Sequence, residues 1–181
     1  MLFTTAIALL STAFTACKKD NPVAQVVYPS QSGGVTDFIA GKTLNTISTT
    51  YELGVSFRSS KSGTIKSLKV MVPNTGNKRV TLWKVSDHSI VASRTINCTS
   101  ISNWNTLATE ITIEADTDYM LSVNTDKYYR FSAAAGSLPF VKGNITLNNY
   151  RSNFGSSQTF PEENNGSLVY GFVDFTFQRA L

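Results

Sequence analysis

Apolar and polar residues alternate through most of the chain beyond residue 50, in short runs separated by Gly, Asn, Asp or Pro. In residues 51–57, for example, every second residue from Tyr51 to Phe57 is apolar. The same pattern recurs in residues 65–72, 79–85, 90–96, 106–113, 119–123 and 167–178. A period of two indicates strands with one buried face, and these runs show no helical period. Short strands with frequent turns predict an all-β fold, an antiparallel, jelly-roll-like β-sandwich.

The first 16 residues are uncharged and largely apolar, and Cys17 is followed at once by Lys18 and Lys19. This stretch is shorter than the roughly 20 apolar residues that span a bilayer. An apolar run, small residues, a lone cysteine and a polar tether are typical of a bacterial lipoprotein signal. We predict a signal peptide over residues 1–16, a lipidated Cys17 beginning a flexible tether over 17–40, and one domain over 41–181. An ordinary secretory signal with a chance cysteine is the alternative.

Lipid on Cys17 would make the membrane a partner and would place the protein in the bacterial cell envelope, with the outer membrane as the expected site. Charged residues make up 15% of the chain, and the formal net charge is +4. The basic residues are scattered along the predicted strands, so we expect no nucleic-acid partner. Once Cys17 is lipidated, Cys98 has no cysteine partner within the chain, so the apolar core must stabilise the fold.

Several short motifs occur in an order that resembles a known family. They are residues 51–57, Gly63-Thr64-Ile65, Asn74-Thr75-Gly76, Leu82-Trp83, Trp104, residues 113–119, Phe160-Pro161 and residues 173–177. In this order the chain resembles the bacterial family called domain of unknown function 4082, over residues 51–177. The resemblance implies an exported β-sandwich. Asn103 replaces the family's usual glycine, residues 126–150 match poorly, and the family's function is undefined, so the resemblance implies no particular chemistry.

Candidate catalytic and metal-binding groups are few. His88, the single histidine, lies in a predicted turn with Asp87 adjacent in sequence, which is poor geometry for a Ser-His-Asp set. Glu52 and Asp174 lie on strands that could be neighbours, as paired carboxylates of a glycosidase would, but a solvated or salt-bridged face is the favoured interpretation. Asp116 and Asp118 could supply oxygen to calcium, although a plain turn also explains them. We expect no enzyme activity, no cofactor and no metal.

Aromatic, amide and guanidinium groups cluster in the least regular stretch of the sequence, residues 126–165. Sugar-binding sandwiches combine rings that stack on sugars with polar groups that bind hydroxyls. The candidate ligand-binding residues are Tyr128, Tyr129, Arg130, Asn148, Tyr150, Arg151 and Asn153. Rings that cap the ends of the core are the alternative explanation. The expected function is a non-catalytic surface module that binds glycan or another cell-surface ligand.

A structural, adhesion or assembly protein that docks on another envelope protein is the rival interpretation. Its signature would be a contiguous exposed apolar patch, for which Tyr170 and Phe172 are the candidates.

Overall fold

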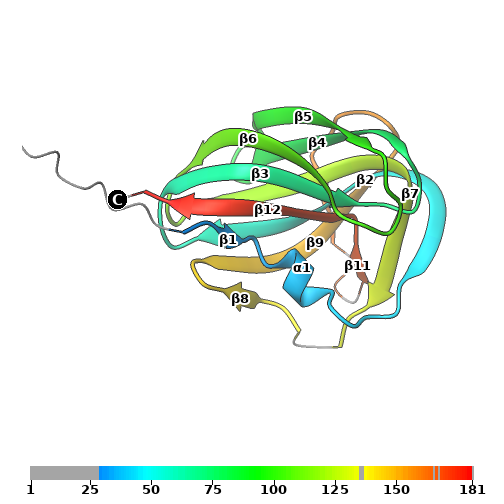
Figure 1. The fold of residues 1–181 in the computed structure, drawn as a ribbon, viewed down its shortest axis with the longest axis horizontal. Helices are drawn as coiled ribbons and strands as arrows, with labels where there is room; N and C mark the ends of the chain where they lie inside the picture. The colour runs from blue at the N-terminus through cyan, green and yellow to red at the C-terminus, as the bar shows by residue number, and fades with distance from the viewer. Residues whose placement is uncertain (1–28, 135–136, 165, 167, 181) are drawn as a thin grey trace, which may run out of the picture.

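The computed structural model describes residues 29–134, 137–164, 166 and 168–180. The predicted signal peptide, Cys17 and the first part of the predicted tether lie outside these residues. Two antiparallel sheets pack against each other (Figure 1), which confirms the predicted all-β sandwich. In the described part of the chain, no helix has the length and apolar character needed to cross a membrane.

The smaller sheet consists, in spatial order, of β1 (Gln31–Ser32), β12 (Phe172–Arg179), β3 (Gly63–Met71) and β6 (Asn105–Ile113). The larger sheet consists, in spatial order, of β10 (Glu163–Asn164), β9 (Ile145–Phe154), β2 (Asn45–Ser59), β7 (Asp118–Ser132), β4 (Gly76–Lys84) and β5 (Ile90–Cys98). Two further strands join it: β11 (Leu168–Tyr170) pairs with β7, and β8 (Phe140–Lys142) pairs with β9. The short helix α1 (Val35–Phe38) precedes β2.

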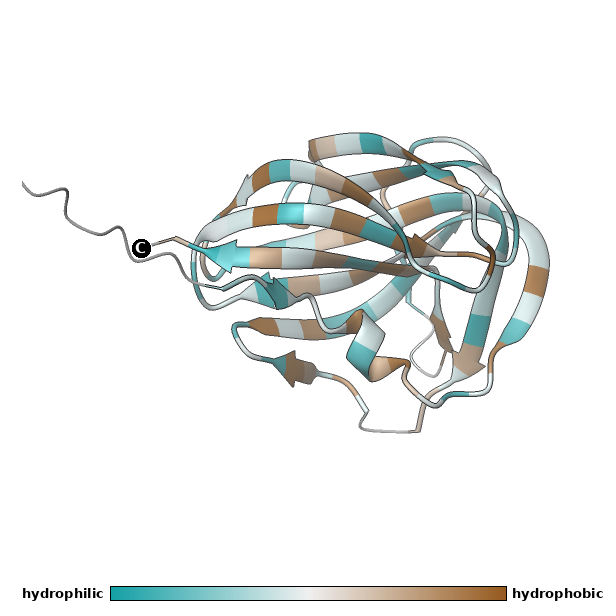
Figure 2. Cartoon of the chain, in the orientation of Figure 1, coloured by the Kyte–Doolittle hydropathy of each residue, from teal (hydrophilic) through white to brown (hydrophobic). Residues whose placement is uncertain are grey.

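The core lies between the sheets, where the period-two pattern places its apolar residues. Leu53, Val55 and Phe57 of β2 are fully buried, as predicted, and the alternation of apolar and polar positions is visible along the strands (Figure 2). The rings of Phe57 and Phe175 meet across the sandwich with centroids 4.6 Å apart. Burying such rings contributes about 1.5–3 kcal/mol each, so the inward face of β2 and β12 is a main source of stability.

The sandwich begins earlier than the predicted boundary at residue 41. Strand β1 pairs with β12, and Val35 of α1 is fully buried. Gly33 lies so close to β12 that an added Cβ would come within 2.5 Å of the Asp174 carboxylate. The chain from residue 31 onward is therefore part of the domain, and Gly33 serves close packing where the sequence suggested a flexible tether.

Asp174 holds this N-terminal segment in place. Its Oδ2 accepts hydrogen bonds from Ser32 Oγ (3.1 Å), Thr36 N (2.9 Å) and Thr36 Oγ1 (2.5 Å). Its Oδ1 accepts one from the amide of Phe175 (2.8 Å). A buried carboxylate requires such partners, because burial removes its hydration.

Glu52 and Asp174 are not neighbours, contrary to one sequence expectation. Glu52 lies on β2 in the larger sheet, whereas Asp174 lies on β12 in the smaller sheet. Both side chains are fully buried by other chain segments, Asp174 by residues 32–36, so neither belongs to a solvated face. The period-two pattern identified the outward direction of these residues but could not show that other segments cover them.

Residues 155–162 form the cover over Glu52, and we call them the outer strap. Arg79 Nη2 donates to Glu52 Oε2 (2.9 Å) and to the carbonyl oxygen of Ser156 (3.1 Å). The amide of Asn124 donates to the carbonyl oxygen of Gly155 (3.1 Å). The strap is thereby fixed over β7 and β4, on the face of the larger sheet that points away from the core.

Trp83 is buried under the same strap, on the outer face of β4. Its indole Nε1 donates to Ser122 Oγ (2.8 Å), and Ser122 Oγ donates to Glu52 Oε1 (2.5 Å). The ring of Phe160 meets the indole edge-on, with centroids 5.9 Å apart. The strap therefore covers a second, smaller apolar cluster. The outer face of β9 and of the end of β2, at Ser56 and Arg58, stays open.

Replacing Asp174 with Ala should lower the free energy of unfolding by about 3 kcal/mol, because Ser32, Thr36 and the amide of Phe175 would lose their acceptor. Urea denaturation measures this change. Glu110→Ala is the control: it breaks an exposed ion pair with Lys66 and should cost about 1 kcal/mol or less. Equal losses in the two variants would contradict a role for Asp174 in anchoring the N-terminal segment.

Burial raises the pKa of Glu52 above its ordinary value of 4.5, and hydrogen bonds from Ser122 and Arg79 oppose this rise. A raised folded-state pKa contributes stability that is fully present below the unfolded-state pKa and is lost as pH rises through the folded-state pKa. The difference in unfolding free energy, wild type minus Glu52→Gln, should therefore be larger at about pH 4 than at about pH 7 in urea denaturation. A difference that grows toward neutral pH would mean that the ion pair with Arg79 lowers the pKa of Glu52 by more than burial raises it.

Candidate functional site

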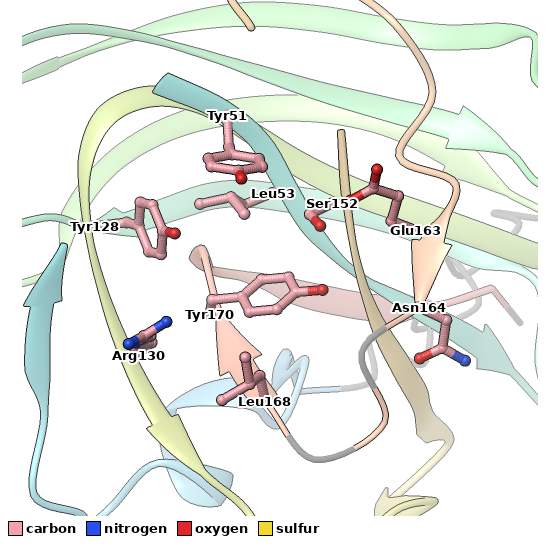
Figure 3. Close-up of a pocket in the computed structure, with 9 residues that line it drawn as sticks. All are labelled: Tyr51, Leu53, Tyr128, Arg130, Ser152, Glu163, Asn164, Leu168 and Tyr170. Atoms are coloured by element: carbon pink, nitrogen blue, oxygen red, sulfur yellow. The ribbon is translucent and has the colours of Figure 1, made fainter. Parts of the chain in front are cut away.

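One pocket lies at an end of the sandwich, where β7 runs between β2 and β11, and we call it the end pocket. Its volume is about 260 Å³. It is lined by Tyr51, Leu53, Tyr128, Arg130, Ser152, Glu163, Asn164, Leu168 and Tyr170. Figure 3 shows Tyr128 and Arg130 on one side of this opening and Glu163 and Asn164 on the other, with Tyr170 between them.

The end pocket combines aromatic rings with both signs of charge. The rings of Tyr51 and Tyr128 meet edge-on, with centroids 6.0 Å apart. Burial raises the pKa of Tyr128, so its hydroxyl remains a protonated hydrogen-bond donor at neutral pH. Arg130 and Glu163 contribute one positive and one negative group. The formal charges cancel, so the pocket suits a neutral ligand with several hydroxyl groups.

Phe154 places an exposed ring beside the end pocket. Its side chain is 69% exposed, and its ring meets that of Tyr51 edge-on with centroids 5.4 Å apart. A single exposed ring is normal on a folded surface, so the contact of Phe154 with a ring that lines the pocket is what makes it a candidate for contact with a ligand. Phe154 at the end of β9 therefore extends the aromatic surface of the pocket toward solvent.

A second pocket lies on the open outer face of β9 and β2, and we call it the outer hollow. Its volume is about 500 Å³. It is lined by Ser56, Arg58, Val85, Asp118, Thr146, Asn148, Asn149 and Arg151. Arg58 donates from Nε and Nη2 to the two carboxylate oxygens of Asp118, at 2.8 and 2.5 Å. The hollow is polar and has two guanidinium groups but one carboxylate.

The structure divides the predicted ligand-binding residues between these two sites. Tyr128 and Arg130 line the end pocket. Asn148 and Arg151 line the outer hollow, on a different face of β9. The expected single cluster is therefore two separate groups. Tyr128 and Arg130 lie on β7 and line the end pocket, whereas Asn148 and Arg151 lie on β9 and line the outer face.

The remaining predicted residues take other places. Tyr150 is 2% exposed, and its ring packs between Phe38 and Tyr170 in the core, so it presents no face to a ligand. Burial and the charge of Asp174 raise its pKa. The ring of Tyr129 stacks on that of Phe172, and its hydroxyl shares a hydrogen bond with the hydroxyl of Ser102. Asn153 is half-buried on the outer face, opposite Glu52 in register.

Sequence reasoning missed several residues of the end pocket. Tyr51 was assigned to the inward face of its strand, which is correct, but the strand's end opens into the pocket. Glu163 and Tyr170 reach the same pocket from β10 and β11. The signal that could have found them is strand register: Arg130 stands opposite Tyr170 in the β7–β11 pair. No local pattern in the sequence reveals that pairing.

The sequence candidates for chemistry and for docking lie elsewhere. His88 occupies a turn with φ 57°, and its ring stacks on Phe160 at a centroid distance of 3.9 Å. Within the described ranges, no group of three or more His, Cys, Asp or Glu side chains is placed to hold a metal ion. Tyr170 and Phe172 are 4% and 1% exposed, so they form no exposed patch.

Comparison with known proteins identifies the family of this chain. A search of curated proteins finds no match. Among solved structures, a mutant VP2 protein of infectious bursal disease virus in derived T=1 particles aligns with 13% identity and a TM-score of 0.17, over 75% of this chain and 33% of that one. The chain thus spans about a third of that protein, and the similarity is too low to bear on the fold. Residues 39–171 match one family throughout, and the chain therefore belongs to the family described as "Domain of unknown function (DUF4082)".

Proposed function

We propose that this protein is a non-catalytic binding module, held on a bacterial membrane by lipid on Cys17, whose ligand is a glycan at the cell surface. The observation that carries the proposal is the end pocket, where Tyr51, Tyr128 and Tyr170 surround a small space together with Arg130 and Glu163. Rings provide apolar faces for sugar C–H groups, and the polar groups match sugar hydroxyls.

Size and charge favour a neutral sugar in the end pocket. Its volume of about 260 Å³ is below the usual range for sites that enclose drug-sized ligands. A single sugar unit or the end of a glycan chain suits this space. The exposed ring of Phe154 would then contact the next unit of the chain, outside the pocket. The rings of Tyr170 and Phe172 are buried, so these two residues do not supply the exposed patch that the rival docking function requires.

Binding at the end pocket is tested with the full chain, purified in detergent, on an array of neutral glycans. Arg130→Gln and Phe154→Ser should each weaken binding about tenfold or more, because one removes a charged hydrogen-bond donor and the other an aromatic contact. Val141→Ser is the matched control, since Val141 is 63% exposed on β8 and lies outside the pocket lining.

Binding that survives both pocket substitutions would remove the end pocket as the glycan site. Absence of binding to every glycan by a folded sample would overturn the glycan proposal. Crosslinking on intact cells would then test docking to an envelope protein.

Membrane attachment is tested by replacing Cys17 with Ser in the producing cell. The wild-type chain should fractionate with membranes and incorporate a palmitate analogue, whereas Cys17→Ser should lose the label and the attachment. Cys98→Ser is the control, because Cys98 is a buried core residue and its loss should leave labelling unchanged. A Cys17→Ser protein that remains labelled and membrane-bound would refute lipidation at this position.

A further inference from the structure

The outer hollow holds a positive charge that its own side chains do not neutralise. Arg58 donates two hydrogen bonds to Asp118, and this ion pair neutralises the charge of Arg58. Arg151 takes part in none of the ion pairs among the described residues. Counting the lining side chains alone, two guanidinium groups face one carboxylate, which leaves one positive charge and favours a ligand that places one carboxylate in the hollow.

The Arg151 side chain is held from one side by its neighbours on the sheet. Its Nε donates to Asn149 Oδ1 (3.1 Å), and the same oxygen accepts a hydrogen bond from Ser56 Oγ (2.9 Å). The backbone amide of Asn149 donates to Ser56 Oγ (3.2 Å), and Ser56 is buried. This arrangement occupies Nε and fixes the guanidinium plane. The two terminal nitrogens then lie side by side in that plane and can donate to a ligand. A planar fork of this kind matches a carboxylate with two parallel hydrogen bonds.

The rest of the hollow offers donors and acceptors for hydroxyl groups. Asn148 Nδ2 lies 3.5 Å from Asp118 Oδ1, which is a long contact that a ligand hydroxyl could improve. Thr146 and Asn149 add a hydroxyl and an amide to the lining. The volume of about 500 Å³ is nearly twice that of the end pocket, so more than one sugar unit fits.

We propose that the outer hollow binds a carboxylated sugar, with the carboxylate on the terminal nitrogens of Arg151 and neighbouring hydroxyls on Asn148 and Asp118. This site lies on a different face of β9 from the end pocket and does not depend on glycan binding there. A doubly charged group such as phosphate is disfavoured, because the Asp118 carboxylate faces the same space and one positive charge is left to meet it.

The experiment is calorimetric titration of the full chain, in detergent, with trigalacturonate and with its methyl ester. Trigalacturonate should bind, and the neutral ester should bind at least tenfold more weakly. Arg151→Gln should weaken trigalacturonate binding about tenfold or more, and Arg151→Lys should weaken it as well, because lysine keeps the charge but lacks the planar fork.

A matched arginine substitution serves as the control. Arg94→Gln makes the same charge change on exposed β5, at the opposite edge of the larger sheet, and should leave the affinity unchanged. Arg130→Gln, in the end pocket, shows whether the acid binds there instead. Thermal melting of each variant establishes that the fold is retained.

Four results would overturn the proposal: no trigalacturonate binding by the wild type, equal binding of the methyl ester, unchanged affinity in folded Arg151→Gln, or a loss confined to Arg130→Gln. A further arm adds inorganic sulfate and phosphate. If either ion displaces trigalacturonate at a similar concentration, the hollow is a general anion site and the assignment of a sugar acid is wrong. Weak displacement by both ions, together with the loss in Arg151→Gln, supports it.

Discussion

The Glu52 carboxylate, buried on the outer face of the central strand pair β2–β7, is the constraint on which the layout of that face depends. A buried carboxylate must have hydrogen-bond donors, and Ser122 and Arg79 supply them. Arg79 in turn binds the carbonyl of Ser156, so the same contact fixes the outer strap over β7 and β4. The outer hollow lies over β9 and the end of β2, on a part of the same face that the strap does not cover.

The two pockets differ in charge for a structural reason. Arg130 and Glu163 reach the end pocket from different strands, β7 and β10, and their charges cancel. In the outer hollow, Arg58 and Asp118 stand opposite each other on β2 and β7 and pair directly, which leaves Arg151 of β9 without a carboxylate. Our two binding proposals follow this difference: a neutral sugar at the end of the sandwich and a sugar acid on its face.

The N-terminal segment links the proposed anchor to the folded domain. Because β1 pairs with β12, the chain enters the sandwich beside its last strand (Figure 1). Asp174 and Gly33 make this contact close, the first by accepting hydrogen bonds and the second by lacking a side chain. A tether from Cys17 would therefore end at residue 31, about ten residues earlier than the sequence suggested, and the domain would stand closer to the membrane.

The sequence by itself determined the strands that alternate regularly, such as β2 and β3, because a period of two indicates a strand with one buried face. Leu53, Val55 and Phe57 follow it directly. The sequence did not determine β9 or the second half of β7, which lie in the stretch without regular alternation. The tertiary structure decided which residues meet. Tyr150 was a reasonable binding candidate until the packing of α1 and β11 buried it, and Tyr170 joined Arg130 through the register of β7 and β11. Strand order and register depend on contacts between segments far apart in the chain, which local alternation does not encode.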